Sequence, residues 1–278
     1  MSIGENIKKI REAKGWSQYE LAEKIGVTFQ AISSWERDEY MPEMKKFPDL
    51  IKALEVPPTF ILKDTEVTYE TKDAIYNWEH MKTYVKTMAK AENLKETLKA
   101  VDFAVDAHEG QPRKNTTVPY ISHPLTMACH ALAMGIRGDE VIAAILLHDV
   151  IEESLKGHIK KDIKLEDLPV NERTRELVDL MTCPDDTGKN RKEIRDVYYG
   201  KLARDADGAL IKCIDRCNNL TTMSWGLAPD RIYRMINETE YYYPALLKLI
   251  KSTPEYNDAA WLLQYQMESM LDIYKRLM

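Results

Sequence analysis

The chain has 278 residues, a length that suits two ordinary domains or one large one. Hydrophobic residues make up 44% and charged residues 30% of it, which is typical of a folded globular protein and excludes a largely disordered or fibrous chain. The 39 basic and 45 acidic residues give a net charge of −6. The whole chain therefore lacks the basic excess that many nucleic-acid-binding proteins carry.

The sequence also bears on the cellular compartment. The longest apolar run, residues 141–147, is far shorter than the roughly 20 residues that span a bilayer, and the N-terminus is charged and amphipathic rather than a signal peptide. The four cysteines form no CxxC pair and no disulfide framework for a chain of this length. These features predict a cytoplasmic protein without a membrane partner.

The first part of the chain, residues 3–62, reads as several short helices. Ser17 with Glu20 three residues later forms a capping box, Gly26 supplies a tight turn, and Thr28 caps the next helix. The expected elements are a helix that stops at Gly15 and helices over 17–25, 28–37 and 44–54.

Two short helices joined through Gly26 form the arrangement that places a recognition helix in the major groove of DNA. The segment SQYELAEKIGVTFQAISSWER resembles the helix-turn-helix domains of the phage-repressor and Cro class, over about residues 3–62. The resemblance implies a phosphate contact and base contacts from the recognition helix, where a Gln suits adenine. The DNA-binding residues predicted in this way are Gln18, Thr28, Gln30, Ser33 and Ser34.

The charge of this segment qualifies the DNA-binding prediction. Residues 1–64 hold 10 basic and 11 acidic side chains, and four acidic residues follow the recognition helix: Glu36, Asp38, Glu39 and Glu43. Weak, salt-sensitive binding to double-stranded DNA by a homodimer that engages two half-sites is therefore expected. A domain that serves only in dimerisation or protein binding is the alternative.

The rest of the chain is also helical in its periodicity. Residues 65–93 read as a helical connector with a stripe of aromatic residues that packs on one of the domains. Beyond it, no segment shows the alternation of apolar and polar residues typical of a strand as clearly as the helical periodicity, so an all-α protein is predicted. The expected helices are 94–108, 124–134, 138–154, 172–182, 190–205, 207–225, 229–252 and 255–277.

The segment AILLHDVIEES contains a cluster of candidate metal-binding and catalytic residues. On a helix, His148 and Glu152 are four residues apart, as are Asp149 and Glu153, so the four polar groups share one face that follows an apolar stretch. Burying two carboxylates and an imidazole there costs several kcal/mol unless a metal or a positive partner offsets the charge. The pattern therefore predicts a metal site.

Two further segments complete a ligand set. PYISHP places His123 before a proline, and IKCIDRCNNL places Asp215 in a mainly apolar helix. Together with His148 and Asp149 they offer two imidazoles and two carboxylates, a set suited to Mn²⁺, Fe²⁺ or Zn²⁺, and the mixed shell favours Mn²⁺ for hydrolysis.

These segments, together with AVDFAVDAHEGQPRK, occur in an order that resembles the HD-type hydrolases of the RelA/SpoT family, most closely the small alarmone hydrolases, from about residue 95 to 278. The resemblance implies Mn²⁺-dependent hydrolysis of the 3′-pyrophosphate of ppGpp and pppGpp to GDP or GTP and pyrophosphate. It implies that His123, His148, Asp149 and Asp215 hold the metal and that Glu152 and Glu153 position and activate the attacking water.

The resemblance also assigns substrate contacts. Arg113 and Lys114 match a basic pair near the nucleotide base, Asn219 matches a residue that contacts the ribose, and Tyr120 is a candidate for the pocket wall. This chain departs from the family in two places, with Glu153 where the family usually has Asp and Asn218 where it often has His.

The sequence thus predicts three parts: a helix-turn-helix domain over 1–64, a connector over 65–93 and an HD-type phosphohydrolase over 94–278. Three alternatives stay open. In the first, the HD fold serves only as the nucleotide sensor of a transcription regulator. In the second, the enzyme acts on an adenosine alarmone or on NADPH. In the third, the protein is an antitoxin against an alarmone synthetase.

Overall fold

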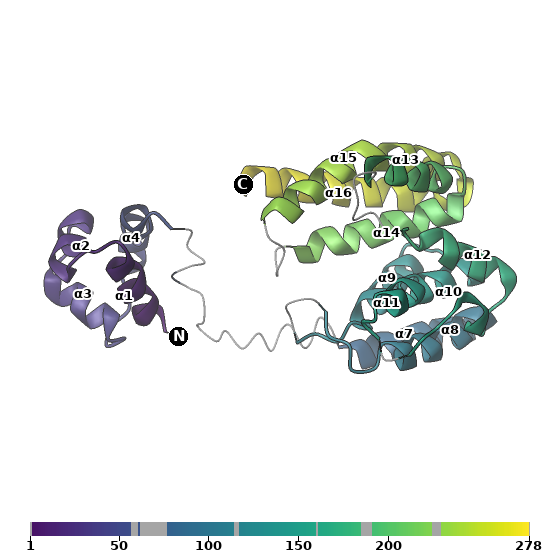
Figure 1. Ribbon diagram of the computed structural model, residues 1–278, viewed down its shortest axis with the longest axis horizontal. Coiled ribbons are helices and arrows are strands. Elements are labelled where there is room, and N and C mark those ends of the chain that lie inside the picture. The colour runs from purple at the N-terminus through teal and green to yellow at the C-terminus, as the bar shows by residue number, and fades with distance from the viewer. Residues whose placement is uncertain are drawn as a thin grey trace. The chain divides into compact units, whose positions relative to one another are not determined.

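A computed structural model describes residues 2–56, 61, 77–113, 117–159, 161–184, 191–223 and 229–277. The chain divides into two compact units, Met1–Asp73 and Ala74–Met278. Figure 1 shows the helices of both, and each unit is described by itself.

The first unit consists of short helices whose ends follow from local capping. Ser17 and Glu20 form the expected capping box at the start of α2, and Thr28 Oγ1 accepts a hydrogen bond from Ala31 N at the start of α3. Gly26 ends α2 with φ of 64°, a conformation that glycine adopts without strain. The helices are α1 (Ile3–Ala13), α2 (Gln18–Ile25), α3 (Phe29–Glu36) and α4 (Phe47–Leu54), with a 3-10 turn at Met44–Lys46.

A small apolar core holds these helices together. Ile7, Leu21, Ile32 and Leu50 are fully buried and come from four different helices. A Cβ atom added at Gly4 would lie 2.1 Å from Trp35 O, so the absence of a side chain there lets α1 approach the end of α3.

The acidic residues at and after the end of α3 have partners within the unit. Glu36 is buried and accepts two hydrogen bonds from Arg11, at 2.6 and 2.9 Å. Asp38 accepts from Gly4 N, while Glu39 pairs with Arg37 and Glu43 with Lys45. The charges of Glu36, Glu39 and Glu43 are therefore offset by basic side chains, and Glu36 faces the core rather than the surface that the sequence pattern suggested.

The second unit is built from ten helices in its described part, and the described residues contain no strand beyond one isolated bridge between Pro112 and Pro119. The predicted all-α fold is confirmed. The helices are α7 (Trp78–Ala91), α8 (Lys95–Ala107), α9 (Ser122–Ala133), α10 (Asp139–Leu147), α11 (Val150–Leu155), α12 (Glu172–Met181), α13 (Arg191–Leu202), α14 (Ala206–Thr222), α15 (Pro229–Ser252) and α16 (Asn257–Leu277).

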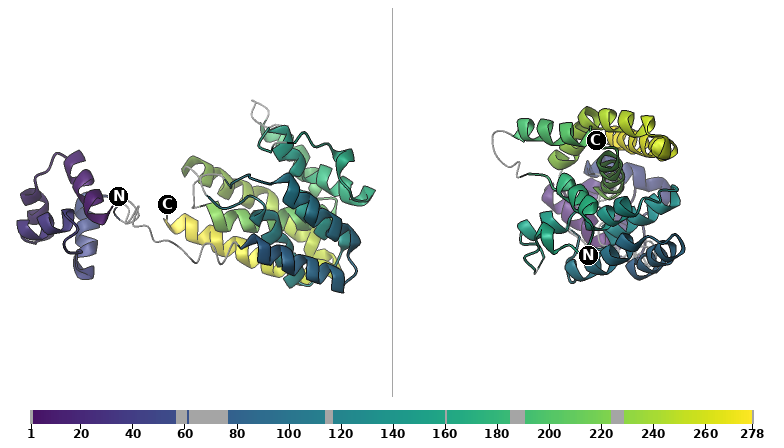
Figure 2. Two further views of the ribbon diagram at one scale, coloured as in Figure 1. Left: turned by 90° about the horizontal axis from the view of Figure 1, so that it is seen from below. Right: turned by 90° about the vertical axis from the view of Figure 1, so that its right-hand side faces the viewer.

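Helix α10 is the centre of this unit. Its residues 141–147 are all buried, and it contacts α8, α9, α12 and α14. Asp139 at its first turn accepts hydrogen bonds from Glu96 N and Thr97 N, which fixes α10 against the beginning of α8. Helix α14 packs on α15 and α16 and also on α9. It therefore joins the layer that contains α15 and α16 to the layer that contains α9 and α10, as Figures 1 and 2 show.

Part of the expected connector is a core helix of the second unit. Helix α7 lies within residues 65–93 and packs on α8 and α9, with Val85 and Ala89 fully buried. Residues 65–76 lie outside the described residues. No helix in the described part of the chain combines the length and apolar character needed to cross a membrane.

The single helix expected over 138–154 is interrupted. Helix α10 ends at Leu147 and α11 begins at Val150, with His148 and Asp149 in a turn between them. Consecutive residues of a regular helix point about 100° apart. The interruption lets these two side chains turn toward one point, with His148 Nε2 and Asp149 Oδ2 3.2 Å apart.

Candidate active site

The four side chains predicted from the sequence to bind a metal converge on one point. His123 lies in the first turn of α9, His148 and Asp149 join α10 to α11, and Asp215 lies in the middle of α14. His123 Nε2 is 3.6 Å from Asp149 Oδ2 and 3.4 Å from Asp215 Oδ1. His148 Nε2 is 4.0 Å from Asp215 Oδ1. Three separate helical segments thus bring two imidazoles and two carboxylates together.

Both imidazoles are oriented by a hydrogen bond on the far side of the ring. His123 Nδ1 lies 2.6 Å from Asn218 Oδ1, and His148 Nδ1 lies 2.8 Å from the Ile145 carbonyl oxygen. Because both oxygens can only accept, each Nδ1 carries the proton. The Nε2 atom of each ring then faces the carboxylates.

The carboxylates are held in their charged form. Burial raises the pKa of Asp149, but His148 and His123 outweigh it and bring the pKa well below its usual value. Burial likewise opposes ionisation of Asp215, and the Lys212 ammonium 3.1 Å away reverses the effect, so the pKa of Asp215 is also lowered. Tyr120 Oη donates to Asp149 Oδ2 at 2.6 Å, and Asn219 Nδ2 donates to Asp215 Oδ1 at 2.5 Å.

The two imidazoles differ in basicity. Burial and the Arg113 guanidinium lower the pKa of His123. Burial also acts to lower the pKa of His148, but the adjacent Asp149 carboxylate is stronger and raises that pKa to about 9. His123 is therefore neutral at neutral pH, whereas His148 is positively charged, with a second proton on Nε2, when no metal is bound.

The arrangement fits a divalent metal ion. Within the described part of the chain, the buried His148 Nε2 has no hydrogen-bond partner. Adjacent ligand atoms around an octahedral ion with bonds of about 2.1 Å lie about 3 Å apart, which is close to the 3.2 to 4.0 Å spacings here. Two imidazole nitrogens with carboxylate oxygens suit Mn²⁺, Fe²⁺ or Zn²⁺.

Comparison with known proteins identifies the fold around this cluster. Residues 100–244, which contain all four converging side chains, match the family described as HD domain. The chain belongs to the HD-domain family. HD domains are metal-dependent hydrolases, and this one carries a His/Asp cluster of the kind that binds a metal.

Relatives of this HD domain include proteins named as hydrolases of (p)ppGpp. The chain is 32% identical over 181 residues to the bifunctional (p)ppGpp synthase/hydrolase SpoT of Escherichia coli, covering 63% of this chain and 25% of the relative. It is 34% identical over 152 residues to the guanosine-3′,5′-bis(diphosphate) 3′-pyrophosphohydrolase of Haemophilus influenzae, covering 52% and 21%. The chain thus spans a quarter or less of these two relatives.

The first unit matches a different family. Residues 7–61 match the family described as helix-turn-helix. The chain is also 30% identical over 96 residues to the SPbeta prophage-derived uncharacterized HTH-type transcriptional regulator YonR of Bacillus subtilis, covering 34% of this chain and 89% of the relative. The chain therefore joins a helix-turn-helix domain to an HD domain.

The two glutamates predicted to activate water, Glu152 and Glu153, lie in different surroundings. Glu153 is buried, and its Oε2 accepts from Gln111 Nε2 at 2.6 Å and lies 3.0 Å from His158 Nδ1. Glu152 is partly exposed and pairs with Lys156, which also lies 3.6 Å from Glu153 Oε1. The side chain of Glu153, one methylene longer than the Asp usual in the family, is thus accommodated by its contacts with Gln111 and His158.

The residues predicted to bind substrate lie beside the cluster. The Arg113 guanidinium is 3.4 Å from Asn219 Oδ1 and from Thr222 Oγ1, and 6.0 Å from the Tyr120 ring centroid. Asn219 and Tyr120 in turn contact Asp215 and Asp149. Lys114 lies outside the described residues.

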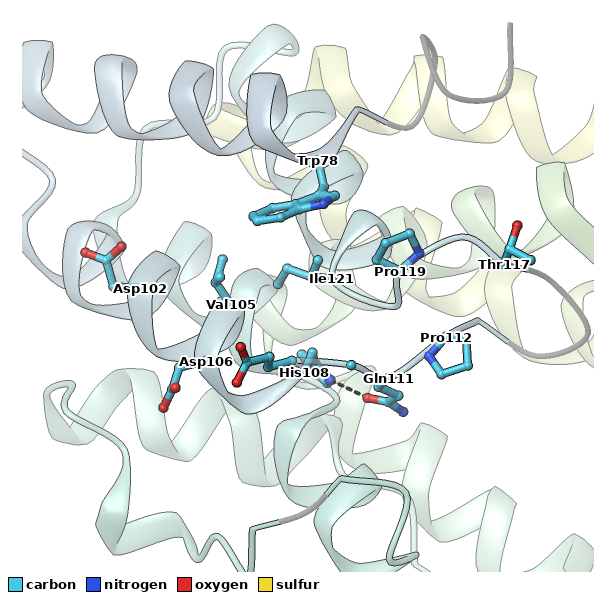
Figure 3. Close-up of a pocket in the computed structure, with 12 residues that line it drawn as sticks. Trp78, Asp102, Val105, Asp106, His108, Gln111, Pro112, Thr117, Pro119 and Ile121 are labelled. Atoms are coloured by element: carbon cyan, nitrogen blue, oxygen red, sulfur yellow. Dashed lines mark hydrogen bonds between the residues drawn. The ribbon is translucent and has the colours of Figure 1, made fainter. Parts of the chain in front are cut away.

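A cavity of about 510 Å³ lies next to this group. Figure 3 shows Trp78 facing Val105 and Ile121 across it, with the hydrogen bond between His108 and Gln111 at its edge. His108 also stacks on Tyr120, with ring centroids 4.8 Å apart. None of the four converging side chains lines this cavity, so it adjoins the candidate metal centre without containing it.

The predicted DNA-binding residues differ in their exposure and in their hydrogen bonds within the domain. Gln30 and Thr28 are exposed, and Ser33 and Ser34 are half-buried on α3. Thr28 caps α3. Gln18 donates a hydrogen bond of 2.7 Å to Glu36, so its amide is engaged within the domain.

Several residues that support the site were not assigned to it from the sequence. In the sequence, Asn218 stood out only as a departure from the family, and Gln111, Lys212 and His158 received no role in the site. A polar residue in an apolar helical pattern was the available signal for Asn218 and Lys212. For Gln111 and His158, local sequence gave no signal, because their partner Glu153 comes from a different element or turn.

Proposed function

We propose that the HD domain hydrolyses the 3′-pyrophosphate of the guanosine alarmones ppGpp and pppGpp with Mn²⁺ as its metal. The observation that carries the proposal is the convergence of His123, His148, Asp149 and Asp215, with both Nε2 atoms directed at the carboxylates. Similarity to proteins named as guanosine-3′,5′-bis(diphosphate) 3′-pyrophosphohydrolases supports the choice of substrate.

In this proposal the four converging side chains hold the ion. A bound divalent metal lowers the pKa of a coordinated water and offsets phosphate charge. Tyr120, Asn219 and Lys212 keep the two carboxylates ionised and oriented. Asn218 and the Ile145 carbonyl do the same for the imidazoles.

Glu152 and Glu153 are the proposed acceptors for the proton of the attacking water. A general base of this kind typically contributes about 10²- to 10⁴-fold to a rate. The water oxygen forms a bond to phosphorus, the bond from phosphorus to the ribose 3′-oxygen breaks, and that oxygen leaves with a proton as the 3′-hydroxyl. The products are GDP or GTP and pyrophosphate.

Arg113 and Lys114 are proposed to bind the base, and Asn219 the ribose. A planar guanidinium can stack on a purine. The contacts of Arg113 with Asn219 and Thr222 place its guanidinium next to α14, on the side of the unit that carries Asp215.

For the first unit we propose sequence-specific DNA binding by a homodimer, in the cytoplasm. Helix α3 would enter the major groove with exposed Gln30 and the neighbouring Ser33 and Ser34 toward base edges. The ion pairs of Glu36, Glu39 and Glu43 offset part of the charge that would otherwise oppose phosphate.

The decisive experiment offers the purified full-length protein with Mn²⁺ three substrates, ppGpp, ppApp and NADPH, and follows the release of pyrophosphate or phosphate. Turnover of ppGpp that EDTA abolishes and Mn²⁺ restores supports the proposal. Preferential turnover of ppApp or NADPH would refute the guanosine assignment. Binding of Mn²⁺ without any turnover would refute the enzymatic proposal and favour a nucleotide sensor.

DNA binding is tested separately by gel-shift titration against the DNA upstream of the protein's own gene. The double variant Gln30→Ala with Ser33→Ala should lose specific binding. Lys8→Met, an exposed change on α1, is the control. Undiminished specific binding by the double variant would refute the assigned base contacts.

A further inference from the structure

We infer that Asn218 is a positioning residue for the metal: its side-chain oxygen fixes His123 in the tautomer whose Nε2 lone pair faces the ion. The inference rests on the metal-site part of the proposed function and not on the identity of the substrate. Asn218 is 5% exposed and His123 3% exposed, so the contact between them is shielded from water.

The geometry defines which ring nitrogen is protonated. Asn218 Oδ1 lies 2.6 Å from His123 Nδ1, a short hydrogen bond in which the amide oxygen accepts. A neutral imidazole carries a single N–H, so a proton on Nδ1 leaves Nε2 with its lone pair. Only this tautomer can donate Nε2 electrons to a metal.

The surroundings of His123 favour the opposite tautomer. Its Nε2 lies 3.6 Å from Asp149 Oδ2 and 3.4 Å from Asp215 Oδ1, and two carboxylates attract a proton to that nitrogen. A proton on Nε2 would have to leave before an ion could bind. Asn218 therefore offsets the pull of the carboxylates.

For His148 the hydrogen-bond acceptor at Nδ1 belongs to the main chain. Its Nδ1 bonds to the Ile145 carbonyl, an acceptor that no side-chain substitution removes. For His123 the acceptor is a side chain, three residues beyond Asp215 on α14 and so on a neighbouring part of the same helix face. One helix thus supplies both a proposed ligand and the group that orients a second one.

Three variants of the full-length protein separate this role from simple packing. Asn218→Leu keeps the approximate shape but removes the acceptor, whereas Asn218→Asp keeps an acceptor oxygen. Thr221→Val is the control, because Thr221 lies one turn away, is exposed and bonds only to the Asn218 main-chain oxygen among the described contacts.

Two measurements are made on each variant. Mn²⁺ affinity is obtained from the electron paramagnetic resonance signal of free Mn²⁺, and the tautomer of His123 is read from imidazole ¹⁵N shifts in the metal-free protein. Asn218→Leu should bind Mn²⁺ about 10- to 100-fold more weakly, the usual cost of removing a partner that orients a metal ligand. Asn218→Asp and Thr221→Val should stay within about fivefold of wild type on the same scale.

The results discriminate as follows. Wild-type affinity in Asn218→Leu, or a proton on His123 Nε2 in the wild type, overturns the inference. If Asn218→Leu does not fold, the wild-type tautomer and the affinity of Asn218→Asp decide it. A wild-type protein that binds no Mn²⁺ refutes the proposed metal site and this inference together, whereas wild-type affinity in Asn218→Leu, in a protein that does bind Mn²⁺, refutes the inference alone.

Discussion

The Gln111 side-chain amide donates a hydrogen bond of 2.6 Å to Glu153 Oε2. This contact joins the loop after α8 to the helix that follows the HD dipeptide, across 42 residues of sequence. His108 holds the other end of the same amide through its Nδ1, at 2.7 Å from Gln111 Oε1. A row of buried polar groups therefore runs from the edge of the cavity to a proposed catalytic carboxylate.

Shortening Glu153 should break that row. Glu153→Asp withdraws the carboxylate by one methylene and leaves the buried Gln111 amide without its acceptor, at a cost of about 1–3 kcal/mol. For a unit of this size about 2–4 °C of melting temperature is lost per kcal/mol. Calorimetry on Glu153→Asp should show this loss, and Glu166→Asp, an exposed change, should not. Equal melting temperatures would show that the contact contributes nothing.

Tyr120 offers a test of two roles. The sequence predicts that it lines the substrate pocket, whereas its hydroxyl bonds to Asp149 at 2.6 Å. Tyr120→Phe keeps the ring that stacks on His108 and removes the hydroxyl. We expect Mn²⁺ affinity to fall about tenfold, as for other residues that support a ligand, with KM for ppGpp at saturating Mn²⁺ nearly unchanged. A large rise in that KM would instead favour the pocket-wall role.

Metal binding should release a proton. Burial tends to lower the pKa of His148, but Asp149 raises it to about 9, so the metal-free protein holds a proton on His148 at neutral pH. An ion must displace that proton, and its apparent affinity should rise about tenfold per pH unit between about pH 6 and 8. Calorimetry in two buffers of different ionisation enthalpy measures the release. A result of no proton released at pH 7 would contradict the charge assigned to His148.

The helix-turn-helix domain contains a buried ion pair between Arg11 and Glu36. Arg11→Met would leave the buried Glu36 carboxylate without a cationic partner and with only the hydrogen bond from Gln18, and such a loss typically costs about 3–5 kcal/mol. Such a loss should unfold this small unit, abolish DNA binding and leave ppGpp hydrolysis in place. Limited proteolysis and gel shift measure the first unit, and pyrophosphate release the second. Retained DNA binding would show that the pair is dispensable.

The helices of this protein were largely predictable because their signals are local. Ser17 and Glu20, three residues apart, form the capping box expected of them, and Gly26 adopts the positive φ that its turn requires. The apolar run before His148 is the buried central helix α10. The family resemblance was confirmed for both units. The roles assigned to the individual site residues stay predictions.

The sequence alone therefore predicts the helical fold, the helix-turn-helix and HD families, and a set of residues that converge in space. Long-range packing sets the interruption between α10 and α11, the burial of Glu36 against Arg11, and the partners of each converging side chain. Asn218 and Gln111 act on residues that are 95 and 42 positions away. The physical reason is range: caps and periodicity act within a few residues, whereas the orientation of an imidazole or the pKa of a buried carboxylate depends on groups that only folding brings within 3 to 4 Å.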